Sequence, residues 1–419
     1  MADVPLLGFF LAAIVTFIYG SDENNNFLLV LSSLFISLAI LTKYSGLLLI
    51  PILCAYDLLN KKKKGIIFLL IPTVIFILWN GYCVLSYRQS LFLAGVASKL
   101  QQYIFNRIWI RVFASLSSLS GVSLVVLFIM PLLLLKKKGL FCFFISIVSG
   151  VLPFMVKDIF GVYSLPQKYF LAVLFVASTY AILFIFKQGI VSLSKRSDGD
   201  TAFLFIWFLS IFMFNLLANF IAARFTLLLL PPLFFFIYNQ LAPYNAAETR
   251  SKLTFVILIP FVFSTVLAMG DYQAAGVYRH FVGYIKQELP VEENNYFFCG
   301  EYYRSWGYFY YLQKAYGNVK RHFQMINETL SPEAVIVVPA ELVLPIVIER
   351  WDAFSQYLDK FYNKNLINSI SYKGNIFLHH KKFRAGFYSH DWGLLPFYIS
   401  VKKEPLEKFE IYRLTKGGG

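Results

Sequence analysis

The sequence predicts an α-helical polytopic membrane bundle of about ten transmembrane segments, followed by a C-terminal extracytoplasmic α/β domain. Of the 419 residues, 58% are hydrophobic and only 15% are charged, and the mean hydropathy is +0.62. Soluble domains carry about 25% charged residues. Apolar runs approaching the roughly 20 residues that cross a bilayer follow one another as far as residue 270. The last 149 residues then hold 15 of the 23 acidic residues, which indicates a soluble domain.

The boundary at residue 270 divides the chain into two expected domains, 1–270 and 271–419. In the first, length and hydropathy predict apolar segments at 5–20, 27–42, 45–59, 65–86, 112–135, 139–156, 168–187, 202–221, 225–240 and 253–270. In the second, strand-like runs at 296–299, 334–338, 375–379 and 409–414 alternate with helical stretches such as 341–362. This alternation predicts a small α/β domain.

Lysine and arginine residues predict the orientation of the bundle. The stretches 60–64, 136–138, 187–201 and 241–252 would lie on one side of the membrane, and they carry 12 of these residues. The opposite stretches, 87–111 and 157–168, carry six. Because cytoplasmic loops are enriched in Lys and Arg, we expect the first set in the cytoplasm. Residue 1 and the domain 271–419 are then expected outside an inner or plasma membrane.

The net charge of +15 is better explained by topology than by nucleic-acid binding. Lysines form blocks between apolar segments, as at 61–64 and 136–138, and no nucleic-acid-binding motif accompanies them. The four cysteines form no CxxC pair, and the five histidines show no metal-ligand spacing. We therefore expect no bound metal, no cofactor and no nucleic-acid partner.

Five stretches of the sequence occur in an order that points to a known family: ADVPLLGFFLAAIVTF, LAILTKYSGLLLIP, AARFTLLLLPPL, DYQAAGVYRHF and GEYYRSWGYFYYLQKAYG. Together they resemble the bacterial dolichyl-phosphate-mannose-protein mannosyltransferase-like family, glycosyltransferase family 39 in the broad sense, which includes the lipid A aminoarabinose transferases. The resemblance implies a class C membrane glycosyltransferase. Such an enzyme moves a sugar from a polyprenyl-phosphate donor, with inversion, to a protein, lipid or glycan acceptor at the outer membrane face.

The resemblance also has an implication for the N-terminus. Family members resemble a thirteen-helix bundle whose principal catalytic carboxylate lies in a large outer loop after the first helix. Ten segments plus three would complete such a bundle, so we expect this chain to lack the N-terminal helices and that carboxylate.

Lys43 is the only charged residue between Glu23 and Asp57. A lysine at membrane depth is costly unless it faces protein, water or a counter-ion. The resemblance implies that Lys43, with its neighbour Tyr44, binds the phosphate of the donor lipid. Alternatively, Lys43 extends to the membrane surface from a helix end that Ser45 and Gly46 break. Its replacement by methionine would then be neutral or stabilising.

Three other residues are expected at the same site. Asp3 matches a second acidic position of the family and is the expected catalytic residue of this chain, positioning the acceptor; beside Pro5 it also suits a helix N-terminus. Arg224 lies where the family reads Arg-Tyr, although this chain has Phe225. It is expected to contact phosphate or to anchor its helix at the membrane surface. Arg107 is expected to line the same pocket or to face lipid headgroups.

Two other functions stay open at this point. A transporter or flippase of lipid-linked saccharides would also use many helices and a buried lysine, although the sequence lacks the internal repeat that transporters commonly show. The second is a catalytically inactive glycosyltransferase fragment.

Overall fold

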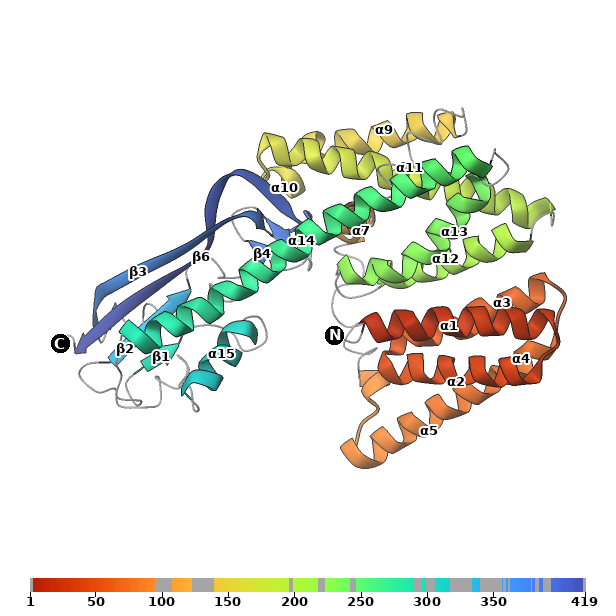
Figure 1. The fold of residues 1–419 in the computed structure, drawn as a ribbon, viewed down its shortest axis with the longest axis horizontal. Helices are drawn as coiled ribbons and strands as arrows, with labels where there is room; N and C mark the ends of the chain where they lie inside the picture. The colour runs from red at the N-terminus through yellow and green to blue at the C-terminus, as the bar shows by residue number, and fades with distance from the viewer. Residues whose placement is uncertain are drawn as a thin grey trace. The chain divides into compact units, whose positions relative to one another are not determined.

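A computed structural model of the chain describes residues 3–94, 108–122, 139–195, 199–217, 223–241, 246–288, 296–298, 306–316, 334–339, 356, 359–360, 362–377, 379–380, 384–386 and 393–416. The chain divides into two compact units, Met1–Ile259 and Pro260–Gly419, and each is described by itself. The first unit is helical, and the second combines helices with a small sheet (Figure 1).

The first unit begins with two helices, α1 (Asp3–Asp22) and α2 (Asn26–Thr42), that pack along each other (Figure 1). Asn25 is the N-cap of α2, because its side-chain oxygen accepts hydrogen bonds from the backbone N–H groups of Phe27 and Leu28. Gly20 keeps the pair close: a Cβ there would lie 3.0 Å from Leu29. The chain continues through η1 (Tyr44–Leu48), α3 (Leu49–Leu59), α4 (Lys64–Phe68) and α5 (Leu70–Tyr87).

The remaining helices of the first unit pack around α11, the longest helix that lies entirely within this unit. They are α7 (Ile108–Val122), α9 (Leu140–Met155), α10 (Lys157–Phe160), α11 (Leu165–Lys195), α12 (Gly199–Leu217), η2 (Ala223–Leu229) and α13 (Leu230–Leu241). Small polar residues join α7 to α11. The hydroxyls of Ser120 and Ser178 are 2.5 Å apart, and Ser178 also donates to the carbonyl of Leu116. Such pairs let helices approach closely in an apolar medium.

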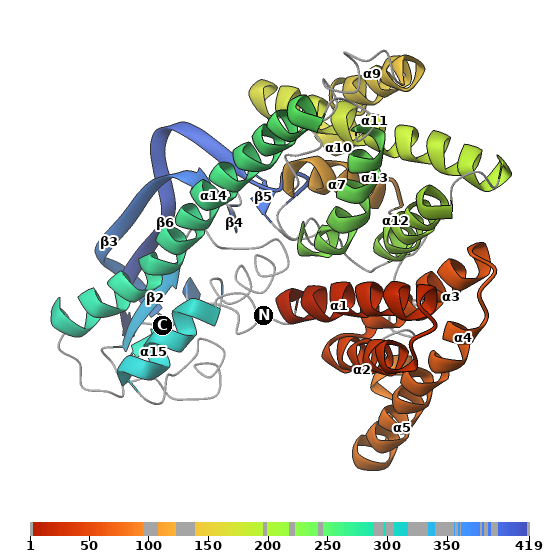
Figure 2. The same ribbon diagram turned by 45° about the vertical axis from the view of Figure 1, so that its right-hand side comes forward.

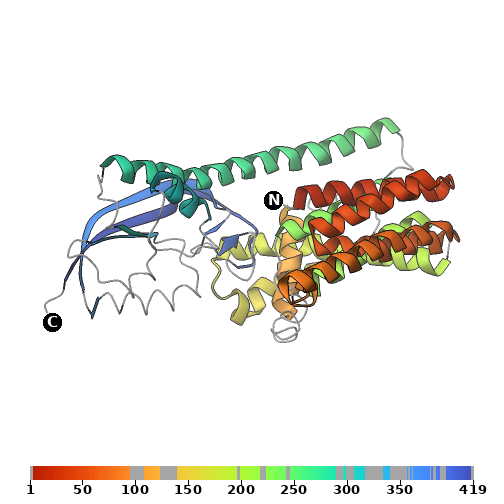
Figure 3. The ribbon, with the colours of Figure 1, turned by 90° about the horizontal axis from the view of Figure 1, so that it is seen from below.

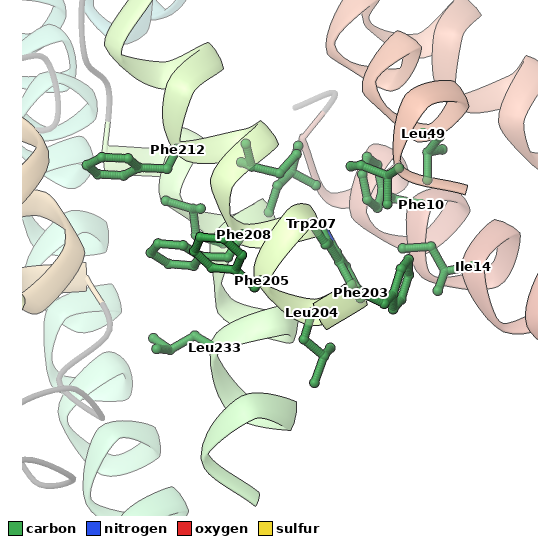
Figure 4. Close-up of a cluster of buried hydrophobic side chains, with 14 of the residues drawn as sticks. Phe10, Ile14, Leu49, Phe203, Leu204, Phe205, Trp207, Phe208, Phe212 and Leu233 are labelled. Carbon is green, nitrogen blue, oxygen red and sulfur yellow. The ribbon is translucent and has the colours of Figure 1, made fainter. Parts of the chain in front are cut away.

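Aromatic side chains join α12 to the N-terminal helices of the first unit. Trp207 of α12 stacks on Phe10 of α1 with ring centroids 6.0 Å apart, and both side chains are fully buried (Figure 4). Phe203 and Leu49 belong to the same cluster. Lipid tails are as apolar as these side chains, so in a membrane the cluster stabilises the fold mainly through van der Waals packing.

Four of the described helices are long and apolar enough to cross a membrane: Asp3–Asp22, Lys64–Tyr87, Leu165–Ser194 and Gly199–Leu217. Four further apolar helices are shorter: Asn26–Thr42, Tyr44–Leu59, Leu140–Met155 and Phe225–Phe236. The prediction of about ten full spans is therefore not supported. The physical reason is clearest at 45–59 and 225–240, which begin with 3₁₀ turns. The α-helix α3 has 11 residues and is only about 17 Å long, against roughly 30 Å of hydrocarbon.

The second unit contains a four-stranded sheet in the order β1-β2-β6-β3. Strand β1 pairs in parallel with β2, whereas β6 is antiparallel to both β2 and β3. Its elements are the part of α14 (Ala246–Glu288) from Pro260 onward, β1 (Tyr296–Phe298), α15 (Trp306–Tyr316), β2 (Ala334–Pro339), β3 (Tyr362–Phe377), β4 (His379–His380), β5 (Ala385–Gly386) and β6 (Tyr398–Lys416).

The core of the second unit lies between the sheet and one side of α14. Phe281 of α14 stacks on Phe409 of β6 with ring centroids 3.6 Å apart, and Ile285, Leu312 and Val337 are buried beside them. Figures 2 and 3 show this outer part of α14 lying along β3 and β6. The packing holds the last turns of α14 against the sheet.

The predicted strand runs coincide with observed strands, but β3 and β6 extend well beyond the predicted runs. The runs 296–299 and 334–338 coincide with β1 and β2, and 409–414 lies within β6. Strand β3, however, begins at Tyr362, well before the predicted start at 375. The expected helix at 341–362 lies largely outside the described residues.

Candidate functional site

Asp3 and Lys43, expected at one site from the sequence, form an ion pair in the structure. Nζ of Lys43 lies 2.6 Å from Oδ1 of Asp3. The two side chains are 31% and 15% exposed, respectively, so the pair is mostly withdrawn from the surface. Asp3 is in the first turn of α1, where a negative charge also complements the helix dipole. The structure thus supplies the counter-ion that a lysine in this apolar region requires.

The local backbone explains why Lys43 points away from the helix that precedes it. Lys43 is the C-cap of α2, with an extended conformation (φ −162°, ψ 137°), and its N–H donates to the carbonyl of Ala39. The 3₁₀ turn η1 follows at once and folds back on α2. A Cβ at Gly46 would lie 2.5 Å from the carbonyl carbon of Ala39, so only glycine fits there. The predicted helix break at Ser45–Gly46 is therefore confirmed.

A third element, η2, reaches the same ion pair. Nζ of Lys43 lies 4.6 Å from the ring centroid of Phe225, within the range of a cation–π contact. The carbonyl of Phe225 accepts a hydrogen bond of 3.2 Å from Nδ2 of Asn215 in α12. In α7, Nη1 of the buried Arg111 lies 3.5 Å from the carbonyl oxygen of Leu216. Ends of α1, α2, α7 and α12 are thereby connected around Lys43.

Tyr44 lies next to Lys43 but its ring packs in a different direction. It makes edge contacts with Phe76 and Phe92, at centroid distances of 6.2 and 5.4 Å, and those two rings also contact each other. This aromatic group holds η1 against α5 and the residues that follow it. The expected donor-binding role of Tyr44 stays a prediction.

The two arginines predicted at the site cannot be placed with it. Arg224 belongs to the backbone of η2, but its side chain lies outside the described part of the structure. Arg107 lies wholly outside the described residues. Among the residues that are described, no group of three or more His, Cys, Asp and Glu side chains is arranged to hold a metal ion.

A second polar cluster lies at the other end of α1. Asp22 accepts hydrogen bonds from the Tyr56 hydroxyl and the Lys62 ammonium, and Lys62 forms an ion pair with it. The fully buried Asp57 accepts a 2.5 Å hydrogen bond from the Ser21 hydroxyl. Asp3 and Asp22 are the two ends of one 20-residue helix, so Lys43 and Lys62 lie at opposite ends of the bundle. Lys62 is therefore a natural control for Lys43.

Two features of the site were not recognisable from the sequence. The first is the pairing of Asp3 with Lys43, because 40 positions separate them and many other carboxylates could have served. The second is the contact of Lys43 with the Phe225 ring. From the sequence, Phe225 was noticed only as a departure from an Arg-Tyr pattern, whereas in the structure Lys43 contacts the face of its ring.

The chain has no counterpart in the comparisons with known proteins: no family model, no curated protein and no solved structure matches it. The chemistry of the site therefore rests on its own geometry. An ammonium, a carboxylate and an aromatic face meet at one end of a bundle of apolar helices. Such a group can hold a phosphate through the ammonium and orient a hydroxyl through the carboxylate.

Proposed function

We propose that the protein is an integral membrane glycosyltransferase that moves one sugar from a polyprenyl-phosphate donor to an acceptor hydroxyl at the outer face of a cell membrane. The observation that carries the proposal is the Asp3–Lys43 ion pair, beside the Phe225 ring, at one end of the apolar bundle. The order of family-like stretches in the sequence supports the same activity. The proposal includes ten membrane segments within residues 1–270 and an extracytoplasmic position for the second unit.

Lys43 is suited to hold the donor phosphate. An ammonium has three N–H donors, and one is directed at Oδ1 of Asp3. The others can reach a phosphate oxygen that approaches from the membrane surface. Ser45, two residues after Lys43, has a buried hydroxyl without a hydrogen-bond partner among the described residues. Because a buried hydroxyl without a partner costs about 1–3 kcal/mol, a ligand or water oxygen bound there would be favoured.

The reaction requires a base, an attack and a leaving group. A carboxylate accepts the proton of the acceptor hydroxyl, and the hydroxyl oxygen attacks the anomeric carbon with inversion. The bond between that carbon and the phosphate oxygen breaks, and the polyprenyl phosphate leaves with the electron pair. Lys43 stabilises the charge that develops on the phosphate. In this chain we assign to Asp3 the positioning of the acceptor, and not the acceptance of its proton.

A donor-binding experiment tests the proposal. The chain is reconstituted in nanodiscs and titrated with polyprenyl-phosphate mannose and with polyprenyl phosphate alone. We expect Lys43→Met to weaken binding roughly 10- to 150-fold, which corresponds to the loss of one hydrogen bond to a charged group of about 1.5–3 kcal/mol. Lys62→Met is the matched control, because Lys62 also pairs with an aspartate of α1 but at the other end. Its effect on binding should be within about twofold.

Two outcomes would count against this function. If wild type and Lys43→Met bind the donor with equal affinity, Lys43 is not part of the donor site. Movement of the intact lipid-linked saccharide across the bilayer without sugar transfer would instead indicate a transporter. Arginine at position 43 should restore binding only in part, because its planar fork does not reproduce a compact ammonium.

A further inference from the structure

The second unit contains a two-stranded extension that no part of the proposed transfer reaction uses. Residues 409–414 of β6 pair with β2 on one side and β3 on the other, whereas the paired residues within 398–407 have partners only in β3 among the described strands. The extension therefore leaves the four-stranded sheet as a ribbon, visible in Figure 1 as the arched end of β3 and β6. Two-stranded ribbons are marginally stable alone, and contacts with α14 support this one on one side.

The ribbon carries a large β-bulge near its end. Gly374 pairs with Glu404 and Ile376 pairs with Ile399, so residues 400–403 of β6 face the single residue Asn375. The amide of Asn375 donates to the carbonyls of Ser400 and Val401, at 3.0 and 3.4 Å, and so holds the bulge in shape. We call residues 400–403, Ser-Val-Lys-Lys, the ribbon bulge. Bulges are specific features that redirect side chains.

The side chains of the ribbon bulge have an unusual combination of exposure and chemistry. Val401 is 101% exposed, and Ile399 beside it is 45% exposed. Lys402 and Lys403 follow directly and are also exposed. Lys373 of β3 pairs with Pro405, which places a third lysine close to the bulge. An apolar tip followed by lysines is typical of a surface that enters the boundary between lipid headgroups and acyl chains.

Contacts with α14 fix the height of the ribbon along that helix. Ile376 packs so closely on Gly270 that a Cβ there would lie 2.6 Å from its Cγ2. Phe397, at the start of the ribbon, contacts Phe263 with ring centroids 5.3 Å apart. The ribbon end therefore lies along residues 263–270, which are the outer turns of the apolar segment predicted at 253–270.

That part of α14 also presents an apolar surface. The exposed side chains include Phe261 (69%), Val262 (53%) and Met269 (60%). Tyr272 (70%) directly follows Asp271, the first acidic residue after the apolar segment 253–270. Tyrosine is enriched where a membrane helix meets the headgroups. The level of Gly270 to Tyr272 is thus the expected membrane surface, and the ribbon bulge lies beside it.

We infer that the ribbon bulge docks on the surface of a membrane that the apolar part of α14 enters, with Val401 at the acyl boundary and with Lys373, Lys402 and Lys403 against the phosphates of anionic phospholipids. Val401 and the apolar side chains of α14 are both exposed, and three lysines complement a negative surface. Bilayer docking holds the second unit at a fixed height above the membrane. The inference depends on α14 entering the membrane but not on sugar transfer.

Site-specific fluorescence in nanodiscs tests this inference. Val401→Cys carries an environment-sensitive NBD label in a chain whose cysteines, Cys54, Cys83, Cys142 and Cys299, are replaced by serine. Leu366→Cys is the matched control, since Leu366 is an exposed apolar residue (56%) on β3 but outside the ribbon. We expect spin-labelled lipids to quench the label at 401 and aqueous iodide to quench the label at 366. Adding phosphatidylglycerol to phosphatidylcholine should increase quenching at 401 only.

A charge variant gives the second arm of the test. The double variant Lys402→Gln, Lys403→Gln should move the label at 401 from lipid toward water in the anionic nanodiscs. The ratio of lipid-bound to water-exposed label should fall by up to about fivefold for each lysine removed. High salt should have a similar effect. Equal iodide quenching at 401 and 366 would overturn the inference. A second result would also overturn it: in detergent without lipid, the label at 401 becomes more protected from iodide as the protein concentration rises. That result would show that the bulge contacts a second copy of the chain.

Discussion

Lys43 and Asp3 neutralise each other, and this changes the expected effect of replacing either residue. The sequence alone suggested that Lys43→Met would be neutral or stabilising if the lysine had no function. In the structure that substitution leaves Asp3, whose side chain is only 15% exposed, without its partner ammonium. An uncompensated charge in such a position is destabilising, whether or not a donor binds. Stability and function must therefore be measured separately at this site.

We predict that Lys43→Met lowers the free energy of unfolding by about 1–3 kcal/mol, between the values typical of exposed and buried pairs. The double variant Asp3→Asn with Lys43→Met should recover most of this loss, because it removes both charges. Thermal unfolding of the three variants in detergent forms a double-mutant cycle. A coupling energy near zero would show that the ion pair does not contribute to the fold. Donor binding should stay weak in the double variant.

Glu410 of β6 provides a prediction about pH. Burial raises the pKa of this carboxyl, but hydrogen bonds from Lys408 and Tyr412 outweigh burial and leave the pKa below its ordinary value of 4.5. The same contact and burial raise the pKa of Tyr412 to about 12. A lowered carboxyl pKa stabilises the fold above pH 4.5, and the stabilisation is lost as the pH falls through the folded-state value. Its cross-strand partners are Val338 and Ser369, which carry no charge.

We expect wild type to be more stable than Glu410→Gln at neutral pH, and this difference to shrink as the pH falls below about 4.5. Thermal unfolding between neutral and acidic pH measures the difference. Lys408→Met should reduce the pH dependence without abolishing it, because Tyr412 still donates to Oε2. A difference that stays constant with pH would contradict the assignment.

Among the elements, η1 is the one that places Lys43. It can do so only because it lies directly on α2, with Gly46 against the backbone of Ala39. Any side chain at position 46 must push η1 away from α2. The atoms that it would meet belong to the backbone of Ala39, which cannot move aside as a flexible side chain could. The position of the Lys43 ammonium therefore depends on a glycine three residues later.

Gly46→Ala should lower the free energy of unfolding by about 1–3 kcal/mol through overpacking, and it should weaken donor binding because Lys43 shifts. Gly81→Ala is the control: a Cβ at Gly81 in α5 would meet nothing within 4 Å. Alanine there should be neutral or stabilising by up to about 1 kcal/mol, since it is the better helix former. Thermal unfolding and donor titration of both variants decide the matter. Equal stabilities would mean that η1 adjusts freely.

Helices and strands were predicted correctly where the local residue types determine them. They were missed where pairing with a distant strand determines them. The helix break at Ser45–Gly46 and the strand at 334–338 follow from local residue types. The first part of β3, YNKNLINSISYK, is too polar to be recognised as a strand, and it becomes one because β6 pairs along nearly its whole length. Likewise, no local signal shows that the 45–59 segment is divided into η1 and α3. Long-range contacts supply what the local pattern lacks.

At the scale of the whole chain, the described contacts agree with helices that alternate in direction through the first unit. Asp3, Lys43 and Phe225 meet at one end, whereas Asp22, Tyr56 and Lys62 meet at the other. The sequence predicted this alternation from the order of apolar segments. It could not predict which carboxylate each lysine meets, since that depends on how α1, α2 and α3 pack.

The last prediction concerns the sides of the membrane. The stretches expected at the two ends of the bundle carry different numbers of lysines and arginines. Among the described residues, Lys62 of the block 61–64 pairs with Asp22. Because cytoplasmic loops are enriched in these residues, the end with Lys62 and Asp22 is expected to face the cytoplasm and the second unit to face outward.

We predict that a membrane-impermeant maleimide added to intact cells labels Leu366→Cys, whose position is exposed in the second unit, and does not label Lys63→Cys. After permeabilisation both should react, which controls for the reactivity of each site. The cysteine-free background described above removes labelling at native positions. Labelling of Lys63→Cys in intact cells would show that the orientation is the reverse of the predicted one. The Asp3–Lys43 site would then face the cytoplasm, where a sugar acceptor outside the cell could not reach it.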